Sequence, residues 1–202
     1  TGFDDMWREK SLAFIAHVTG QSYGILHDEA EVLETVDALG DVVGSAPYIE
    51  TVVFLQQGSE VTPAAVRGVD PLREVKVSQV PGHMVDGTFL VDYDHAVIGR
   101  DLAMQLGILP GDKDLLYSAQ MFQDSGEDVV YLPQEVIVSG LFELGMWDFD
   151  SRYILAHIDT ARDLFHLEEG VHGIQVMTRD PLNVEPVTRA IATALGPVIV
   201  VR

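Results

Sequence analysis

Two aspartates on either side of a phenylalanine have the spacing that comes nearest to an acid–base pair. Asp148 and Asp150 lie in the run Trp147-Asp148-Phe149-Asp150, and in an extended segment their carboxylates would share one face. Such a pair could exchange protons with a substrate or bind a cation. Aspartate also bonds to its own backbone and begins turns, and we favour a turn here.

Histidine is the other residue type that could build a metal site. The densest ligand-like group is His27-Asp28-Glu29, but adjacent residues do not share a helical face and rarely chelate together. We interpret the group as the capped start of a helix. None of the seven histidines forms a His-x-His or His-Glu-x-x-His pair. We therefore predict no catalytic residue, no metal ligand and no cofactor.

The chain also lacks the local patterns of several common enzyme classes. It contains no Gly-x-x-x-x-Gly-Lys-Ser/Thr loop for nucleotide phosphates and no Gly-x-Ser-x-Gly nucleophile elbow. It has no cysteine, which excludes disulfides and thiolate chemistry. Catalytic groups far apart in the sequence escape such a search. A hydrolase or metal-dependent enzyme that uses Asp148, Asp150 and a distant histidine therefore stays open as a disfavoured alternative.

The composition narrows the classes of partner. With 202 residues, of which 47% are apolar, the chain is large enough to bury a core. Its formal net charge is −20, from 32 acidic and 12 basic residues, so we predict no binding to nucleic acid, which rests on neutralising phosphate. A cationic partner and simple solubility both account for the charge, and we favour solubility or a salty habitat. No apolar run approaches the roughly 20 residues that span a bilayer.

Strand and helix patterns alternate at both ends of the chain. The first half predicts a strand at 14–19, a turn at Gln21–Gly24, a helix over about 29–39 that Asp28 caps, and a strand at 42–57. The second half predicts a strand at 153–156, a helix that Asp159 caps, a strand at 173–177, a helix that Asn183 caps, and a strand at 198–201. This alternation indicates one α/β layer built from two halves.

The middle of the chain has a different pattern. It is rich in glycine and proline, with short β-like runs at 65–69, 87–90, 95–98, 115–117 and 136–138, and one helix over Asp101–Leu106 that Gly107 ends. We predict an α+β fold with two subdomains: a discontinuous α/β subdomain at 1–57 plus 146–202, and an inserted, mainly-β subdomain at 58–145. Residues 1–10 resemble the end of a helix that begins earlier, so we expect an excised fragment.

Four glycine-containing segments follow one another in an order that resembles a known family. They are Arg67–Pro71, Val97–Ala103, Leu106–Asp112 and Val138–Asp150, and Gly2-Phe3 and Ala16-His17-Val18 precede them near the start of the chain. In this order they resemble the periplasmic domain of the lipoprotein-releasing permeases LolC and LolE, relatives of the MacB-type permeases, over nearly the whole chain. The resemblance implies that the terminal subdomain is porter-like and the insertion sabre-like. It also implies a fragment of a multi-pass protein, on the periplasmic side of the inner membrane.

The resemblance further implies a non-catalytic role in an ABC transporter. The expected partners are a second permease subunit, a cytoplasmic ATPase reached through the membrane part, the periplasmic carrier LolA and the lipoprotein cargo. ATP hydrolysis in the ATPase would drive release of lipoproteins from the inner membrane to the carrier. An alternative with the same architecture is a force relay to an adaptor or a cell-wall hydrolase, as in MacB-like or FtsX-like permeases.

In this family one subunit type grips the carrier through an extended loop, and the segment between Leu116 and Pro133 is the candidate here. Its centre, Asp124–Asp128, is polar and turn-forming. Apolar side chains flank that centre and are the candidate contacts for the carrier or the lipoprotein: Tyr117, Met121, Phe122, Val130, Tyr131 and Leu132. A hairpin that offers this edge to a partner and a hairpin that packs on its own sheet both fit the pattern.

Overall fold

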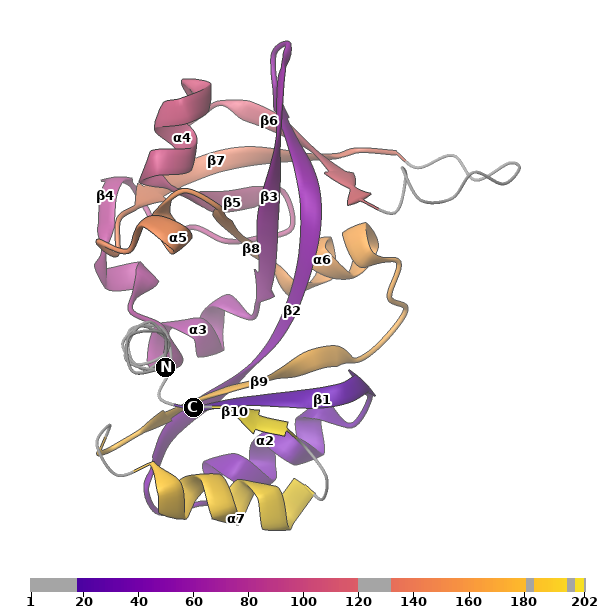
Figure 1. The fold of residues 1–202 in the computed structure, drawn as a ribbon, viewed down its shortest axis with the longest axis vertical. Coiled ribbons are helices and arrows are strands. Elements are labelled where there is room, and N and C mark those ends of the chain that lie inside the picture. The colour runs from indigo at the N-terminus through magenta and orange to yellow at the C-terminus, as the bar shows by residue number, and fades with distance from the viewer. Residues whose placement is uncertain (1–17, 120–131, 181–183, 196–198, 202) are drawn as a thin grey trace, which may run out of the picture. The chain divides into compact units, whose positions relative to one another are not determined.

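The chain is an α+β protein whose packing divides into two compact units. The computed structural model describes residues 18–119, 132–180, 184–195 and 199–201 (Figure 1). The first unit comprises Thr1–Tyr48, Asp70–Val80 and Glu169–Arg202, and the second comprises Ile49–Val69 and Pro81–Glu168. The predicted fold class is confirmed.

The first unit is a four-stranded antiparallel sheet with the strand order β10-β1-β9-β2. Two helices connect its strands, and the order along the chain is strand, helix, strand, then strand, helix, strand. This is the βαββαβ topology of ferredoxin-like folds. The elements are β1 (Val18–Leu26), α2 (Glu29–Asp37), β2 (Val42–Gln57), β9 (Val171–Thr178), α7 (Glu185–Leu195) and β10 (Ile199–Val201).

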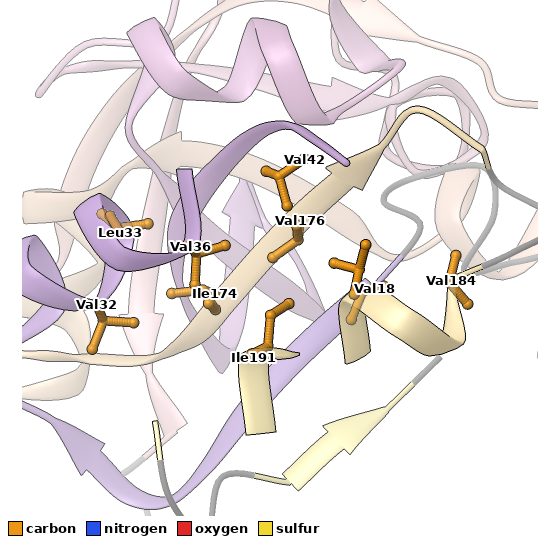
Figure 2. Packing of buried hydrophobic residues seen from close by; sticks show 10 residues of the cluster. Val18, Val32, Leu33, Val36, Val42, Ile174, Val176, Val184 and Ile191 are labelled. Atoms are coloured by element: carbon orange, nitrogen blue, oxygen red, sulfur yellow. The ribbon is translucent and has the colours of Figure 1, made fainter. Parts of the chain in front are cut away.

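One face of this sheet packs against α2 and α7. Side chains alternate along β9, so Ile174 and Val176 point to the same face, where they meet Val36 of α2 and Ile191 of α7 (Figure 2). These residues are at most 1% exposed. The cluster is completed by Val18, Val32, Leu33, Val42, Val184 and Val187.

The other face of the same sheet is covered by α3 (Pro71–Val77). Gln175 lies between Ile174 and Val176 and therefore points away from their cluster. It is fully buried, and its amide donates a hydrogen bond to Glu74 of α3 at 3.1 Å. A buried amide and carboxylate need such a partner, so the pair holds α3 on the sheet.

A second set of bonds secures α3 from its exposed side. Arg73 donates to the carboxylate of Asp37 at 2.9 Å and to the carbonyl of Ser45 at 3.1 Å. The hydroxyl of Ser45 donates to the same aspartate at 2.6 Å. We call the four residues Arg73, Asp37, Glu74 and Gln175 the α3 clasp.

The strands of the second unit pair in a closed ring. β3 (Glu60–Val69) is hydrogen-bonded to β2 and β8, β8 to β5, β5 to β7, β7 to β6, and β6 back to β2 over Val53–Gln56. Closure leaves these six strands without a free edge along the paired stretches. The bounds of the other elements are β4 (Met84–Gly87), β5 (His95–Gly99), β6 (Lys113–Ser118), β7 (Gln134–Phe142) and β8 (Tyr153–His157).

Three helices pack on the ring: α4 (Arg100–Leu106), α5 (Trp147–Asp150) and α6 (Ile158–Phe165). α6 contacts β3, β6 and β8. Its approach to β3 depends on Gly68, because a Cβ at that position would lie 2.3 Å from the Cβ of Ala161. The helix cannot move away without losing the packing of Ile158 and Leu164, which are buried.

Several sequence predictions are confirmed and others are wrong. The helix over Asp101–Leu106 exists as α4, and Gly107 ends it with a left-handed φ of 69°. Gln21–Gly24 is not a turn but part of β1, where the pairing with β9 is irregular. His157, not Asp159, caps α6: its ring nitrogen Nδ1 accepts from the N–H of Asp159. Asp28 occupies the cap position of α2 without a side-chain capping bond.

The compact units and the predicted subdomains differ in their boundaries. The prediction placed β8 and α6 in the terminal subdomain, whereas their packing places them in the second unit. The division at 58 and 145 into a porter-like and a sabre-like subdomain stays a prediction. Residues 14–17 and the cap residue Asn183 lie outside the described residues. In the described part of the chain no helix is long and apolar enough to cross a membrane.

Replacing Gly68 with alanine tests the close packing of α6 on β3. We expect Gly68→Ala to lower the free energy of unfolding by about 1–3 kcal/mol, because the added methyl overlaps Ala161 and the backbone of Ile158. Gly40→Ala is the control, since a Cβ there meets nothing within 4 Å. Urea denaturation measures the free energy of unfolding of both variants. Equal stability of the two variants would contradict the packing described here.

Replacing Asp114 tests how a carboxyl group that is buried in the closed ring of strands affects stability. Asp114 shares a face with Leu116 and Val136, is fully buried, and neither of its oxygens has a hydrogen-bond partner among the described residues. Burial, helped by the charge of Asp112, raises the pKa of Asp114 from 3.8 to about 6. Between these values the folded chain binds more protons than the unfolded chain, so its stability falls as pH rises from about 4 to about 6.

Asp114→Asn removes this titration. We expect the stability of the variant relative to wild type to increase between pH 4 and pH 7, by up to about 3 kcal/mol. Chemical denaturation at both pH values measures the change. Asp148→Asn, at an exposed carboxylate, serves as the control. If the free energies of unfolding of Asp114→Asn and wild type differ by the same amount at both pH values, Asp114 does not titrate in this range.

Candidate functional site

The segment from residue 117 to 132 connects two neighbouring strands. β6 and β7 pair antiparallel, with Lys113 opposite Ile137 and Leu116 opposite Gln134. Tyr117 therefore stands at the point where the pairing with β7 ends, and it is half-buried opposite Phe54 of β2. Leu132 is 82% exposed just before β7 begins. The other predicted contacts, Met121, Phe122, Val130 and Tyr131, lie outside the described residues.

The segment Val138–Asp150, which carries part of the family resemblance, has a structural role at its end. Both oxygens of Asp150 accept backbone hydrogen bonds, from the N–H of Leu144 at 2.8 Å and of Met146 at 3.0 Å. Asp150 is buried. Burial raises its pKa, and the two backbone bonds oppose that shift. The carboxylate thus closes the loop that precedes α5, whereas the run Trp147–Asp150 itself, for which we predicted a turn, forms this short helix.

Asp148 does not complete an acid–base pair with Asp150. Its side chain is about half exposed and lies 3.9 Å from Arg152. Arg152 in turn lies over the ring of Trp147, at 5.6 Å from the ring centroid. With both oxygens of Asp150 occupied by backbone N–H groups, the two aspartates do not face a common substrate.

Two other segments of the resemblance also act on packing. Gly99 lies against the carbonyl of Asp150, where a Cβ would come within 2.3 Å of the oxygen. Asp70 caps α3 by accepting from the N–H of Leu72 at 2.9 Å and of Arg73 at 3.4 Å, and Pro71 fills the first helical position. In both segments, the residues that carry the family resemblance therefore support the packing of the chain.

One group in the described part of the chain has the composition of a metal site. Ligand atoms of Asp92, Asp94 and His95 lie within 4.8 Å of one another. The two aspartates are exposed, and the His95 ring nitrogen Nδ1 already lies 2.7 Å from Asp94. That bond lowers the pKa of Asp94. Reciprocal backbone hydrogen bonds between Asp92 and His95 close a tight turn. This turn explains why the three side chains lie close together.

An apolar hollow on the second unit is the feature that the sequence analysis missed. It has a volume of about 530 Å³. It lies between α4, the turn that follows it, and strands β4 and β7. The lining residues are Val85, Asp86, Arg100, Ala103, Met104, Gly107, Ile108, Leu109 and Leu141. In the sequence, the apolar Met104 on the outer side of α4 was an indication of this hollow. The opposite wall could not be predicted, because its residues come from distant parts of the chain.

Comparison with known proteins places this fold in a family. A sequence model described as "MacB-like periplasmic core domain" matches residues 5–194. The lipoprotein-releasing system transmembrane protein LolC of Xylella fastidiosa strain 9a5c is 29% identical over 99% of this chain and 49% of its own length. LolC of Neisseria meningitidis serogroup B is 29% identical over 73% of this chain and 36% of its own length. The chain thus spans about half the length of the Xylella relative.

Two solved structures share the fold at low sequence identity. The periplasmic region of MacB from Actinobacillus actinomycetemcomitans superposes with a TM-score of 0.63 at 11% identity, covering 96% of this chain and 92% of that one. The extracellular domain of the ABC-type transporter YknZ from Gram-positive bacteria gives a TM-score of 0.60 at 14% identity, covering 88% and 92%. Both extend the similarity to nearly the whole chain.

Separate replacement of the two aspartates tests the loop-closing role. We expect Asp150→Asn to lower the free energy of unfolding by about 1–3 kcal/mol, because an amide nitrogen would face one of the two backbone donors. Asp148→Asn is the matched control and should change it by less than about 0.5 kcal/mol. Thermal denaturation followed by circular dichroism compares them. A larger loss at Asp148 than at Asp150 would refute the assignment.

Proposed function

The chain belongs to the family of MacB-like periplasmic core domains, and from this membership we propose that it serves a permease that releases lipoproteins. In this proposal it is the periplasmic domain of a multi-pass ABC transporter subunit in the inner membrane. The observation that carries the proposal is the similarity to LolC, a protein of a lipoprotein-releasing system, along 99% of the chain. The MacB and YknZ structures support the fold alone.

The proposed role is mechanical and requires no catalytic residue in this chain. A cytoplasmic ATPase would hydrolyse ATP, and a second permease subunit would complete the transporter. The movement would reach this domain through the membrane part and pass a lipoprotein to the carrier LolA. The α3 clasp supports such a role, because one buried polar pair and one ion pair hold α3 firmly within the first unit.

The proposed contact with the carrier or the lipoprotein is the segment from 117 to 132. Leu132 offers an exposed apolar side chain at one end of it, and Tyr117 a half-buried aromatic ring at the other. Tyrosine is enriched among the few residues that supply most of the binding free energy at protein interfaces, and an exposed leucine adds apolar area that a partner can remove from water. Met121, Phe122, Val130 and Tyr131 complete the proposed contact.

A second candidate function keeps the permease architecture and changes the partner. The family is described by its likeness to MacB, so a relay of force to an adaptor or to a cell-wall hydrolase, as in MacB-like or FtsX-like permeases, follows from the same membership. The two functions differ in what leaves the membrane. Lipoprotein release transfers an acylated protein to a soluble carrier, whereas a relay transfers none.

A release assay with the full-length permease distinguishes these functions. The complete subunit is reconstituted with its ATPase and second permease subunit in proteoliposomes that hold a lipoprotein, and the purified carrier is added outside. We expect ATP-dependent appearance of lipoprotein in the soluble fraction, bound to the carrier. ATP hydrolysis without any soluble lipoprotein would overturn the proposal and favour the relay.

Variants in the same assay test the contact. We expect Tyr117→Ser combined with Leu132→Ser to reduce the yield of released lipoprotein about tenfold, because loss of two apolar contacts weakens binding by more than about 1.4 kcal/mol. Val61→Ser is the control, since Val61 is an exposed valine on β3 of the same unit. Release by the double variant at the control rate would exclude this segment as the contact.

A further inference from the structure

We propose that the hollow between α4 and β4 binds an apolar side chain of a partner protein, on a segment whose neighbouring residues are basic. This site lies outside the segment from 117 to 132, to which the proposed function assigns the carrier contact. It is a separate interaction surface on the second unit, and it is independent of whether the permease releases lipoproteins.

The walls of the hollow are apolar and largely exposed. Met104 on α4 is 67% exposed, Leu109 in the following turn is 62% exposed, and Val85 on β4 is 50% exposed. The floor is made of buried side chains, including Ile108 and Leu141. Exposed aliphatic side chains above a buried apolar floor are typical of a surface that a protein partner covers.

The hollow is held in shape before any partner binds. α4 ends at Gly107 in a left-handed conformation, and the N–H of Leu109 donates to the carboxylate of Asp112 at 2.8 Å. At the other end of the helix, Arg100 donates to both oxygens of Glu143 at 2.7 and 2.8 Å. A preformed site saves the free energy of ordering these residues on binding.

The charges around the hollow favour a cationic partner. Arg100 is the one basic residue among its lining, and Glu143 neutralises it. Asp86 lines the hollow, and Asp112 lies beside Leu109. The surroundings therefore carry a net negative charge, in a chain whose formal charge is −20. Charges of this sign attract basic segments and repel acidic ones.

Size and openness favour a protein side chain over a lipid. A volume of about 530 Å³ accepts one or two large apolar side chains. Because Met104 and Leu109 are more than half exposed, an acyl chain lying between them would remain partly in water. The thioether of Met104 adapts to differently shaped partners, as a protein-docking surface requires.

Synthetic peptides provide the probes for a binding experiment with the 202-residue chain. The test peptide carries a Leu-Phe anchor flanked by lysines. A second peptide replaces the anchor with Ser-Ser and keeps the lysines, and a third keeps the anchor and replaces the lysines with glutamates. We expect the test peptide to bind at least about tenfold more tightly than either of the others, and more weakly as salt rises. Fluorescence polarisation measures the affinities.

Variants and NMR locate the binding. We expect Met104→Ser combined with Leu109→Ser to weaken binding of the test peptide about tenfold, and the control Val61→Ser, at an exposed valine on β3, to leave it unchanged. In the wild-type chain the amide shifts on titration should concentrate at Val85, Met104 and Leu109. This second measurement needs no variant and so does not depend on how the variants fold.

Three outcomes would overturn the inference. Equal affinity for the lysine peptides with and without the Leu-Phe anchor would indicate charge attraction alone. Unchanged binding by the Met104 and Leu109 variant would place the contact elsewhere. Displacement of the test peptide by a neutral monoacylglycerol, with shifts at the same residues, would identify a lipid site instead. None of these results bears on the release assay, so the two proposals fail separately.

Discussion

The pairing of β6 with both β2 and β7 is the interaction on which the second unit depends. It closes six strands into a ring, and a ring has an interior that side chains must fill. Leu55, Leu116 and Val136 fill part of it. Asp114 occupies the same face without a hydrogen-bond partner among the described residues, so the closed topology raises the pKa of this carboxyl. α4 packs against β5 and β7 of the ring, and α4 and the turn that follows it form one wall of the apolar hollow.

The parts of the fold that follow from short-range patterns could be predicted from the sequence. The helix at 101–106 has a glycine stop, and the strand at 42–57 is long and β-rich, and both appear with nearly the predicted bounds. Single caps were less predictable: Asp159 is as good a capping residue as any, yet the ring nitrogen of His157 takes that position in α6. The helix therefore begins two residues earlier than a cap at Asp159 would place it.

Long-range pairing could not be predicted in the same way. Ring closure joins β2 to β6 across about 60 residues of chain, and no local periodicity records such a contact. The hollow has the same origin, because Val85, Met104 and Leu141 come from three separate segments. Of the predicted contact residues, the structure describes Tyr117 and Leu132 alone. The sequence indicated a turn near Asp150. It could not predict the two backbone N–H groups that bond to this carboxylate, because their positions depend on how the loop before α5 folds back.

β2 is one unbroken strand of 16 residues that pairs with β9 near its start and with β6 near its end. Antiparallel hydrogen bonds lie perpendicular to the strand. A pull along the length of β2 therefore loads all the bonds of a ladder in shear, and they must break together instead of one after another. Tension applied to this strand would meet its greatest resistance lengthwise, and a sideways pull that peels the strand away would meet far less.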